Sequence, residues 1–253
     1  MNEEQQQLKN LLNQFKGTIQ QKKRYFKERL EQIQDYGYDS DELEKQKLEK
    51  ILELIQIQSL SKKYRKKQIL GKGNVGQVYL MQDIENPQKQ YAYKRNVKKH
   101  EKKLTYQAQL LKQVNKRVPS KSILKYIQHA DNILITEYLK GFVLLDEYLK
   151  KNPEKCLDII PNVNIVMNQL HRAGISHRDL KGENIMIHPE TLEIKIIDFG
   201  VGCIKDSSKF NCKNFIGTSQ KYYPRYQQYK SFQDWKQGDN KALDILWKEL
   251  CDA

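Results

Sequence analysis

With 253 residues, the chain is long enough for one or two domains with a buried core, which excludes a peptide-sized or collagen-like protein. Its 45 Lys and Arg against 31 Asp and Glu give a net charge of +14 with His neutral, and 38% of the residues are hydrophobic. No stretch approaches the ~18 uninterrupted apolar residues of a membrane span, and the chain begins with acidic and polar residues. We therefore predict a polar, basic, intracellular protein, cytoplasmic or nuclear.

Two lysine-rich runs, at 62–67 and 98–103, could bind nucleic acid, although such runs usually form a solvated face. Because the chain has neither a zinc-finger spacing nor an RNA-binding aromatic motif, we expect no specific nucleic acid partner. The cysteines lie far apart and without a CxxC or metal-binding spacing, which predicts reduced thiols. They are Cys156, Cys203, Cys212 and Cys251.

The first part of the chain has a helical period. Between residues 4 and 34, apolar side chains recur at steps of three and four, which predicts one amphipathic helix. A turn-forming cluster at 35–41 interrupts the pattern, and Asp39 with Glu42 offers a capping box for a second helix. We predict an N-terminal helical hairpin extension over residues 1–60. Its apolar stripe comprises Leu8, Leu12, Phe15, Ile19, Phe26, Leu30 and Ile33, then Leu43, Leu48, Ile51, Leu52 and Ile55.

The period changes at Tyr64. Short segments rich in β-branched and aromatic residues, bounded by Gly, Asn, Pro or Asp, predict an antiparallel sheet up to residue 140. After Gly141 the helical period returns, through LLDEYLKKN and LDIIPNVNIVMNQLHRAG. We therefore predict a small strand-rich lobe at 64–140 and a mainly helical lobe at 141–253.

A glycine-rich segment starts the strand-rich lobe. Gly71, Gly73, Gly76 and Val78 fit G-x-G-x-x-G-x-V, but Gly76 leads into a strand, whereas a dinucleotide-binding fingerprint opens a helix. A Walker A loop is excluded because Lys-Ser/Thr does not follow the last glycine. The pattern favours a hairpin over nucleotide phosphates, where missing Cβ atoms let backbone N–H groups approach the anion. Lys94, on the next strand, would pair the α- and β-phosphates.

Residues 177–184 read HRDLKGEN, and residues 198–200 read DFG after a hairpin-like segment. They fill H-R-D-L-x-x-x-N and D-F-G at the expected distance, which is a highly specific combination. From residue 64 to 253 the chain resembles the eukaryotic-type protein kinase family, with the recognisable elements in order. The resemblance implies an α+β, bilobal protein-kinase-like fold with an N-lobe at 64–140 and a shortened C-lobe at 141–253.

The resemblance also implies roles for individual residues. Asp179 would accept the proton of the substrate hydroxyl, while Asn184 and Asp198 would hold Mg²⁺ against the ATP phosphates. Lys181 together with Thr218 resembles the serine/threonine branch, in which both residues contact the base and the γ-phosphate. The implied catalytic residues are Asp179, Lys181, Lys94 and Thr218. The implied ATP-binding residues are Gly71, Gly73, Gly76, Val78, Ala92, Lys94, Thr136, Glu137, Leu139 and Met186.

One departure concerns the helix after Lys94. The segment QAQLLKQVN looks like the family's ExxLLxxVN, with Gln107 in place of the Glu that pairs with the lysine. A Gln can hydrogen-bond the ammonium but contributes no charge. The alternative is a different helix register in which Glu101 reaches Lys94.

Other departures lie further along the chain. Asn214 stands where many kinases have the phosphorylated Thr that Arg178 would receive; Ser207, Ser208 and Tyr222 are alternatives. Arg225 replaces the Glu of A-P-E after Pro224. The segment 239–250 resembles the family's buried helix, with Asp239 supporting the HRD loop.

We predict an ATP- and Mg²⁺-dependent serine/threonine protein kinase that acts on a protein substrate. The alternative is a nucleotide-binding pseudokinase that serves as a scaffold or assembly subunit, and a small-molecule or lipid kinase is a third option. Because the stripe of residues 4–58 needs a partner, we expect it to pack on the kinase domain or to join a second subunit. On the C-terminal helix, Ile245, Leu246, Trp247 and Leu250 are expected to be partly bare.

Overall fold

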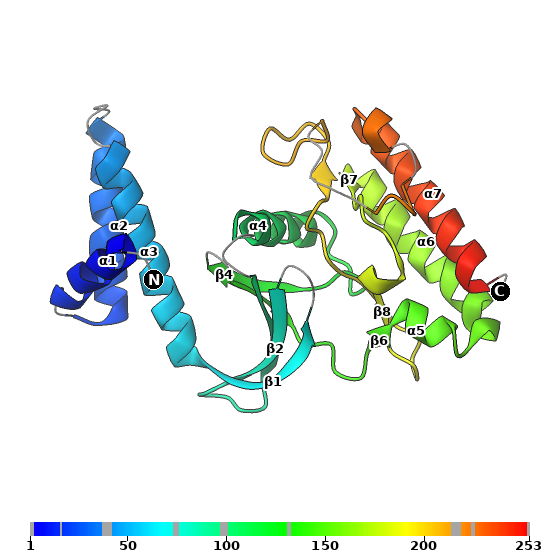
Figure 1. Ribbon diagram of the computed structural model, residues 1–253, viewed down its shortest axis with the longest axis horizontal. Helices are drawn as coiled ribbons and strands as arrows, with labels where there is room; N and C mark the ends of the chain where they lie inside the picture. The colour runs from blue at the N-terminus through cyan, green and yellow to red at the C-terminus, as the bar shows by residue number, and fades with distance from the viewer. Residues whose placement is uncertain are drawn as a thin grey trace. The chain divides into compact units, whose positions relative to one another are not determined.

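The computed structural model describes residues 3–15, 17–36, 42–72, 76–96, 101–130, 133–213, 219–223 and 226–251 (Figure 1). The chain divides into two compact units. The first comprises residues 1–71 and 79–91, and the second comprises residues 72–78 and 92–253. Among the described helices, none is both long enough and apolar enough to cross a membrane.

The first unit begins with three helices, α1 (Glu3–Gln14), α2 (Ile19–Tyr36) and α3 (Glu42–Lys63). The predicted single helix over 4–34 is wrong, because the chain breaks between α1 and α2. Gly17 has a φ of 153°, which L side chains rarely adopt, and a capping box follows it. The Gln21 N–H donates to Thr18 Oγ1 at 3.2 Å, and the Thr18 N–H donates to Gln21 Oε1 at 2.7 Å.

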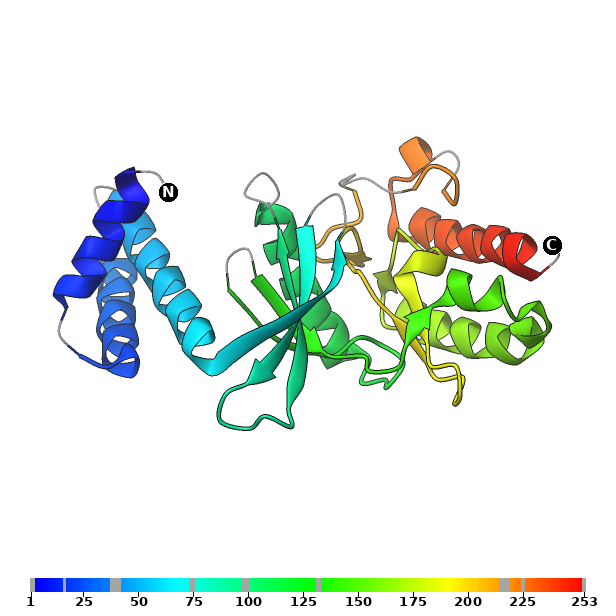
Figure 2. The same cartoon turned by 60° about the horizontal axis from the view of Figure 1, so that its bottom comes forward.

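These three helices share a core of their own (Figures 1 and 2). Leu12 is 0% exposed and Ile51 and Ile55 are each 1% exposed, and the partly buried members of the stripe pack against them. Much of the stripe is therefore covered within the extension itself, because the extra bend lets α1 pack on α3. The predicted cap at Asp39 lies outside the described residues.

Helix α3 runs directly into β1 (Tyr64–Lys72), which is followed by β2 (Gly76–Asp83) and β3 (Gln90–Asn96). Together with β4 (Tyr126–Ala130) and β5 (Ile133–Glu137) they form a five-stranded sheet in the order β1-β2-β3-β5-β4. Strands β4 and β5 are antiparallel, with His129 opposite Leu134 and an irregularity between Tyr126 and Gln128. The predicted strand-rich region is thus confirmed, although the pattern did not single out β4.

In the second unit, α4 (Glu101–Arg117) packs against β4 and β5 (Figure 1). The helical part contains α5 (Leu145–Leu149), α6 (Cys156–Arg172) and α7 (Phe232–Cys251), and α6 and α7 lie side by side (Figure 2). The same unit contains two small antiparallel sheets. These consist of β6 (Val143–Leu144), β8 (Ile185–Ile187) and β9 (Ile194–Ile196), and of β7 (Ile175–Ser176) with β10 (Cys203–Ile204). Short 3-10 helices occupy Pro153–Lys155, Gly182–Asn184 and Tyr226–Gln228.

Helix α7 begins earlier than the resemblance implied. The Asp234 N–H donates to Ser231 Oγ at 3.2 Å and the Ser231 N–H donates to Asp234 Oδ2 at 2.8 Å, so a capping box starts the helix. Of the residues expected to be bare, Leu246 and Leu250 are buried, whereas Ile245 and Trp247 are only partly buried. The expectation of a bare apolar face on α7 is therefore wrong for Leu246 and Leu250, and Ile245 and Trp247 are only partly exposed and pack against the core of this unit.

The cysteines depart from the prediction of reduced thiols. Cys156 is bonded to Cys251, across 95 residues, and Cys203 is bonded to Cys212, across nine residues. Cys156 begins α6 and Cys251 ends α7, and Cys203 lies in β10. Sequence spacing did not reveal these pairs because they depend on how the elements pack.

Candidate active site

Lys94 lies on β3 and meets two partners. Its Nζ donates to Gln107 Oε1 of α4 at 2.9 Å and lies 3.1 Å from Asp198 Oδ2. The predicted register with Gln107 facing Lys94 is confirmed, since α4 presents Gln107 as a buried side chain. The side chain of Glu101 is outside the described residues.

Asp198 begins the DFG segment with a φ of 56°, a left-handed conformation that costs about 1–3 kcal/mol. The Gly200 N–H donates to Asp198 Oδ1 at 3.1 Å, and Phe199 is fully buried against the His177 ring. Burial by itself would raise the pKa of Asp198, but the charge and hydrogen bond of Lys94 outweigh it and hold that pKa below its ordinary value. Asp198 is therefore an ionised carboxylate at neutral pH.

Asp179 is held by donors from three places in the chain. Asn184 Nδ2 donates to Asp179 Oδ2 at 3.0 Å and to the Asp179 carbonyl at 2.7 Å. Lys181 Nζ lies 3.4 Å from the same Oδ2, and the Ser219 N–H donates to Oδ1 at 3.2 Å. The carboxylate thus has a defined orientation even though Thr218, predicted to contact it, lies outside the described residues.

Asp239 of α7 supports the backbone that carries Asp179. It is completely buried, and its carboxylate accepts the N–H groups of His177 at 3.0 Å and of Arg178 at 2.9 Å. Burial would raise the pKa of Asp239, but the hydrogen bond and charge of His171, together with other donors, lower it. The predicted support of the HRD loop by Asp239 is confirmed.

Three further residues of this support were missed by sequence reasoning. Ser176 Oγ and Tyr223 OH each donate to Asp239 at 2.7 Å, and His171 Nε2 lies 3.0 Å from it. Tyr223 OH also accepts the Leu180 N–H at 2.8 Å, which ties the catalytic loop to the segment before α7. No local signal marks these residues, because their partners lie up to 68 positions away.

Arg178 is not placed as a receptor for a phosphate. It is 1% exposed, has a φ of 68°, and its guanidinium lies 4.0 Å from the centre of the Trp235 ring. Burial lowers its pKa to about 10, so it stays charged at neutral pH. Asn214 and the Pro224-Arg225 pair lie outside the described residues.

The predicted nucleotide-binding residues are distributed over the strands. Gly76 and Val78 are on β2, Ala92 and Lys94 on β3, Thr136 and Glu137 at the end of β5, and Met186 on β8, while Leu139 follows β5. Gly71 lies near the end of β1, and Gly73 is outside the described residues. A Cβ on Gly76 would overlap the Arg95 carbonyl oxygen, so this position requires glycine.

Glu137, at the end of β5, also forms a half-buried ion pair. Lys195 Nζ lies 3.0 Å from Glu137 Oε1, and the Glu137 carboxylate accepts the Lys125 N–H at 2.7 Å. These contacts turn the Glu137 side chain toward β9, while its backbone carbonyl accepts the Thr136 hydroxyl at 3.2 Å. The Glu137 N–H itself donates to the Lys125 carbonyl at 3.0 Å.

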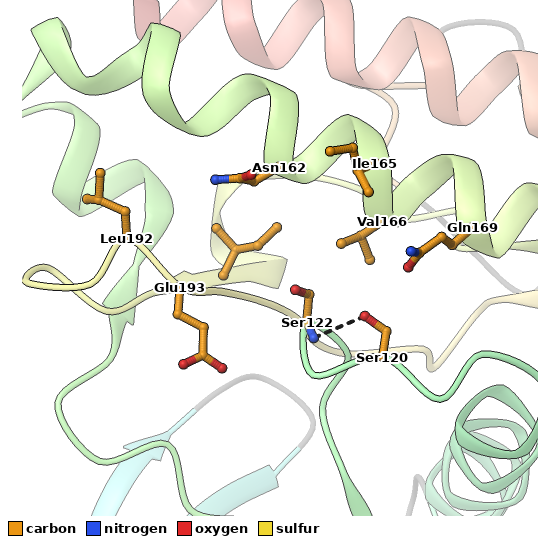
Figure 3. Close-up of a pocket in the computed structure, with 9 residues that line it drawn as sticks. Ser120, Ser122, Asn162, Ile165, Val166, Gln169, Leu192 and Glu193 are labelled. Atoms are coloured by element: carbon orange, nitrogen blue, oxygen red, sulfur yellow. Dashed lines mark hydrogen bonds between the residues drawn. The ribbon is translucent and has the colours of Figure 1, made fainter.

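A separate pocket of about 180 Å³ lies beside α6 (Figure 3). Asn162 and Gln169 of α6 line it together with Glu193, next to the loop in which the Ser122 N–H donates to Ser120 Oγ at 3.2 Å. None of the predicted catalytic or nucleotide-binding residues lines it. It is therefore distinct from the candidate active site.

An antiparallel sheet, a lysine joined to the DFG carboxylate and a buttressed HRD loop define the protein-kinase fold. In sequence, residues 64–235 match the family model of the protein kinase domain, and this match covers more than half of the chain. The chain belongs to the protein kinase family.

The relatives are longer kinases. Calcium-dependent protein kinase 4 of Plasmodium berghei (strain Anka) is 35% identical over 175 residues, which cover 64% of this chain and 32% of that protein. MAP3K epsilon protein kinase 1 of Brassica napus is 30% identical over 174 residues, which cover 63% of this chain and 13% of that protein. A Drosophila melanogaster protein named as a serine/threonine-protein kinase is 28% identical over 148 residues, 53% of this chain and 19% of its own. The chain thus spans about a third or less of the length of these relatives.

Proposed function

We propose that this chain transfers the γ-phosphate of ATP to serine or threonine hydroxyls of a protein substrate. The observation that carries the proposal is the orientation of Asp179. Its Oδ2 is held by Asn184 at 3.0 Å and faces Lys181 at 3.4 Å, while its Oδ1 accepts the Ser219 N–H. A carboxylate fixed in this way can receive the proton of an incoming hydroxyl.

In the proposed reaction the substrate hydroxyl oxygen forms a bond to the γ-phosphorus while the bond to the β–γ bridging oxygen breaks and ADP leaves. The hydroxyl proton passes to Asp179. Lys181, two residues further on, lies where its ammonium can stabilise the negative charge of the transferred group. Lys94 would pair the α- and β-phosphates, and Gln107 holds its ammonium for that contact.

Mg²⁺ would be held by Asp198 and Asn184. Carboxylate and amide oxygens suit this ion, and Lys94 keeps the pKa of Asp198 low, so that the carboxylate is ionised. Asn184 directs its amide nitrogen to Asp179, which leaves the oxygen on the other branch of the planar amide for a metal. When bound, Mg²⁺ would offset the negative charge of the ATP phosphates.

The remaining ATP contacts follow the strands. Val78, Ala92 and Met186 are half-buried and would enclose the purine, with Thr136 at the gatekeeper position. The Glu137 carbonyl and the Leu139 backbone would meet the adenine edge. The glycine-rich segment with Gly71, Gly73 and Gly76 would cover the phosphates.

The preference for Ser/Thr is supported by Lys181 and by relatives named as kinases of this branch. The division into an extension at 1–60, an N-lobe at 64–140 and a C-lobe at 141–253 stays a proposal, as do an intracellular location, cytoplasmic or nuclear, and a partner subunit for residues 4–58. The pseudokinase alternative rests on Gln107 in place of the Glu and on the shortened C-lobe. Because Gln107 still holds Lys94 at 2.9 Å, the first of these grounds is weaker, and no observation favours a scaffold.

The test uses the purified full chain with labelled ATP, Mg²⁺ and a panel of Ser/Thr- and Tyr-containing peptides. We expect label on serine or threonine, identified by phosphoamino acid analysis, and none without Mg²⁺. If the chain binds Mg²⁺-ATP but transfers phosphate to no acceptor, including itself, the kinase proposal is overturned and the scaffold alternative is left.

A further inference from the structure

Tyr106 of α4 contacts the segment that follows DFG. Its hydroxyl donates to the Gly202 carbonyl oxygen at 2.7 Å, and the residue is half-buried. Burial raises the pKa of Tyr106 against the opposing charge of Arg178, so the hydroxyl keeps its proton and remains a donor at neutral pH. Tyr106 directly precedes Gln107, the partner of Lys94.

The Tyr106 ring makes a second contact with the same segment. It packs edge-on against Phe210 with a centroid separation of 5.3 Å and an interplanar angle of 66°. Phe210 is buried because its loop is closed: the Ile204 N–H donates to the Phe210 carbonyl at 2.7 Å, and Cys203 is bonded to Cys212. The aromatic contact therefore belongs to a defined loop.

Gly202 permits the close approach. A Cβ there would lie 3.0 Å from Leu110 Cδ2, and Leu110 is one helical turn beyond Tyr106, on the same face of α4. Helix α4 thus meets the segment from Asp198 to Phe210 in two places, once through Gln107 and Lys94 and once through Tyr106. A shift of α4 that broke the Tyr106 contact would also move Gln107 from Lys94.

We propose that Tyr106 is a positioning residue that fixes α4 to the segment after DFG and so keeps Gln107 in reach of Lys94. The inference rests on the proposed function in that Lys94 is taken to contact ATP. A neutral amide holds an ammonium less strongly than a carboxylate does. Tyr106 therefore supplies part of the restraint on α4 that an ion pair between Lys94 and a Glu at position 107 would supply.

The test compares Tyr106→Phe with a matched control in the full chain. Tyr126→Phe also removes a hydroxyl that makes a 2.7 Å bond, but its partner is His129 on the same strand. We expect Tyr106→Phe to weaken Mg²⁺-ATP binding, measured by calorimetry, by about three- to tenfold, the size of one net hydrogen bond, and Tyr126→Phe to leave it unchanged. KM for ATP should rise more than kcat falls.

A rescue separates positioning from general stability. Gln107→Glu, added to Tyr106→Phe, should restore Mg²⁺-ATP affinity, because an ion pair between the new carboxylate and Lys94 would not need the contact of the Tyr106 hydroxyl. Gln109→Glu on the same helix is the control and should not restore this affinity. Equal affinity of Tyr106→Phe and the parent, an equal loss in both Tyr→Phe variants, or rescue by Gln109→Glu would each overturn the inference. If the parent binds Mg²⁺-ATP without transferring phosphate, the proposed function fails while the binding comparison still decides the role of Tyr106. A parent that binds no Mg²⁺-ATP overturns both.

Discussion

Lys94 Nζ donates a 2.9 Å hydrogen bond to Oε1 of Gln107, so the helix residue that holds the lysine is a neutral amide. The contact places α4 in the register that the family's lysine and helix require. It also leaves Asp198 as the charged partner of Lys94, at 3.1 Å. The hydrogen bond therefore preserves the geometry of the site while it removes one charge from it.

Replacing this amide tests the missing charge. Gln107→Glu should strengthen the hold on Lys94 and raise Mg²⁺-ATP affinity or activity by about fivefold, because charge-assisted hydrogen bonds are roughly twice as strong as neutral ones. Gln109→Glu adds the same charge to α4 and should change little. A lower affinity in Gln107→Glu would show that repulsion between the new carboxylate and Asp198 dominates.

Asp179→Asn should abolish phosphoryl transfer while leaving Mg²⁺-ATP binding nearly intact, since Asp179 faces the acceptor. We expect a loss in kcat of about 10²–10⁴, the usual contribution of a general base. Asp158→Asn, on the exposed first turn of α6, is the control and should retain the parent's kcat. A fully active Asp179→Asn protein would end the enzyme proposal.

The fall in the free energy of unfolding at low pH, the acid limb of the stability curve, should depend on Asp239. Its pKa is lowered in the folded chain, so its contribution is present above the ordinary Asp pKa of about 3.9 and is lost as the pH falls through its lower folded value. Asp239→Asn should lower the free energy of unfolding by about 3–5 kcal/mol at pH 7, because donors such as Ser176 and Tyr223 lose a buried charged partner, and it should flatten this acid limb. Melting curves from about pH 2 to pH 7 measure both effects. Asp244→Asn, exposed on the same helix, should reproduce the parent curve.

The two disulfides should differ in their contribution to stability. In the chain-entropy model the Cys156–Cys251 bond, which spans 95 residues, stabilises by about 2 kcal/mol more than the Cys203–Cys212 bond, which spans nine. Denaturant unfolding of the two double Cys→Ser variants checks this order. Only the variant without the Cys203–Cys212 bond, which closes the loop that contains Phe210, should also weaken Mg²⁺-ATP binding. Treatment of the parent with a dithiol should have the same effect, since it yields two protein thiols and the cyclic disulfide of the reductant.

The three-helix core of α1 to α3 should unfold independently of nucleotide binding. Ile55→Ala removes a side chain that is 1% exposed and should destabilise these helices by about 2–5 kcal/mol, seen as faster amide hydrogen exchange in α1 and α3. Leu11→Ala is the control, because Leu11 is 48% exposed. We expect neither variant to change Mg²⁺-ATP affinity. A large change in Mg²⁺-ATP affinity with Ile55→Ala would show that the N-terminal helices act as a partner of the kinase domain.

The sequence alone determined the family and the motif residues, because the HRD and DFG segments are short and each sits on its own local turn. Asp179, Asn184 and Lys181 lie within six positions and come together through the 3-10 helix at Gly182–Asn184. Helical and strand periods likewise predicted α6 and the first sheet, since a period depends only on neighbouring residues, whereas the family resemblance predicted α4.

Only the tertiary structure decided the contacts between distant segments. The choice of Gln107 as partner of Lys94 depends on how α4 packs against β4 and β5, and the cover of Arg178 by Trp235 depends on where α7 begins. The disulfides and the core of α1 to α3 have the same origin, because burial and side-chain pairing across many residues follow from packing, which no local pattern records.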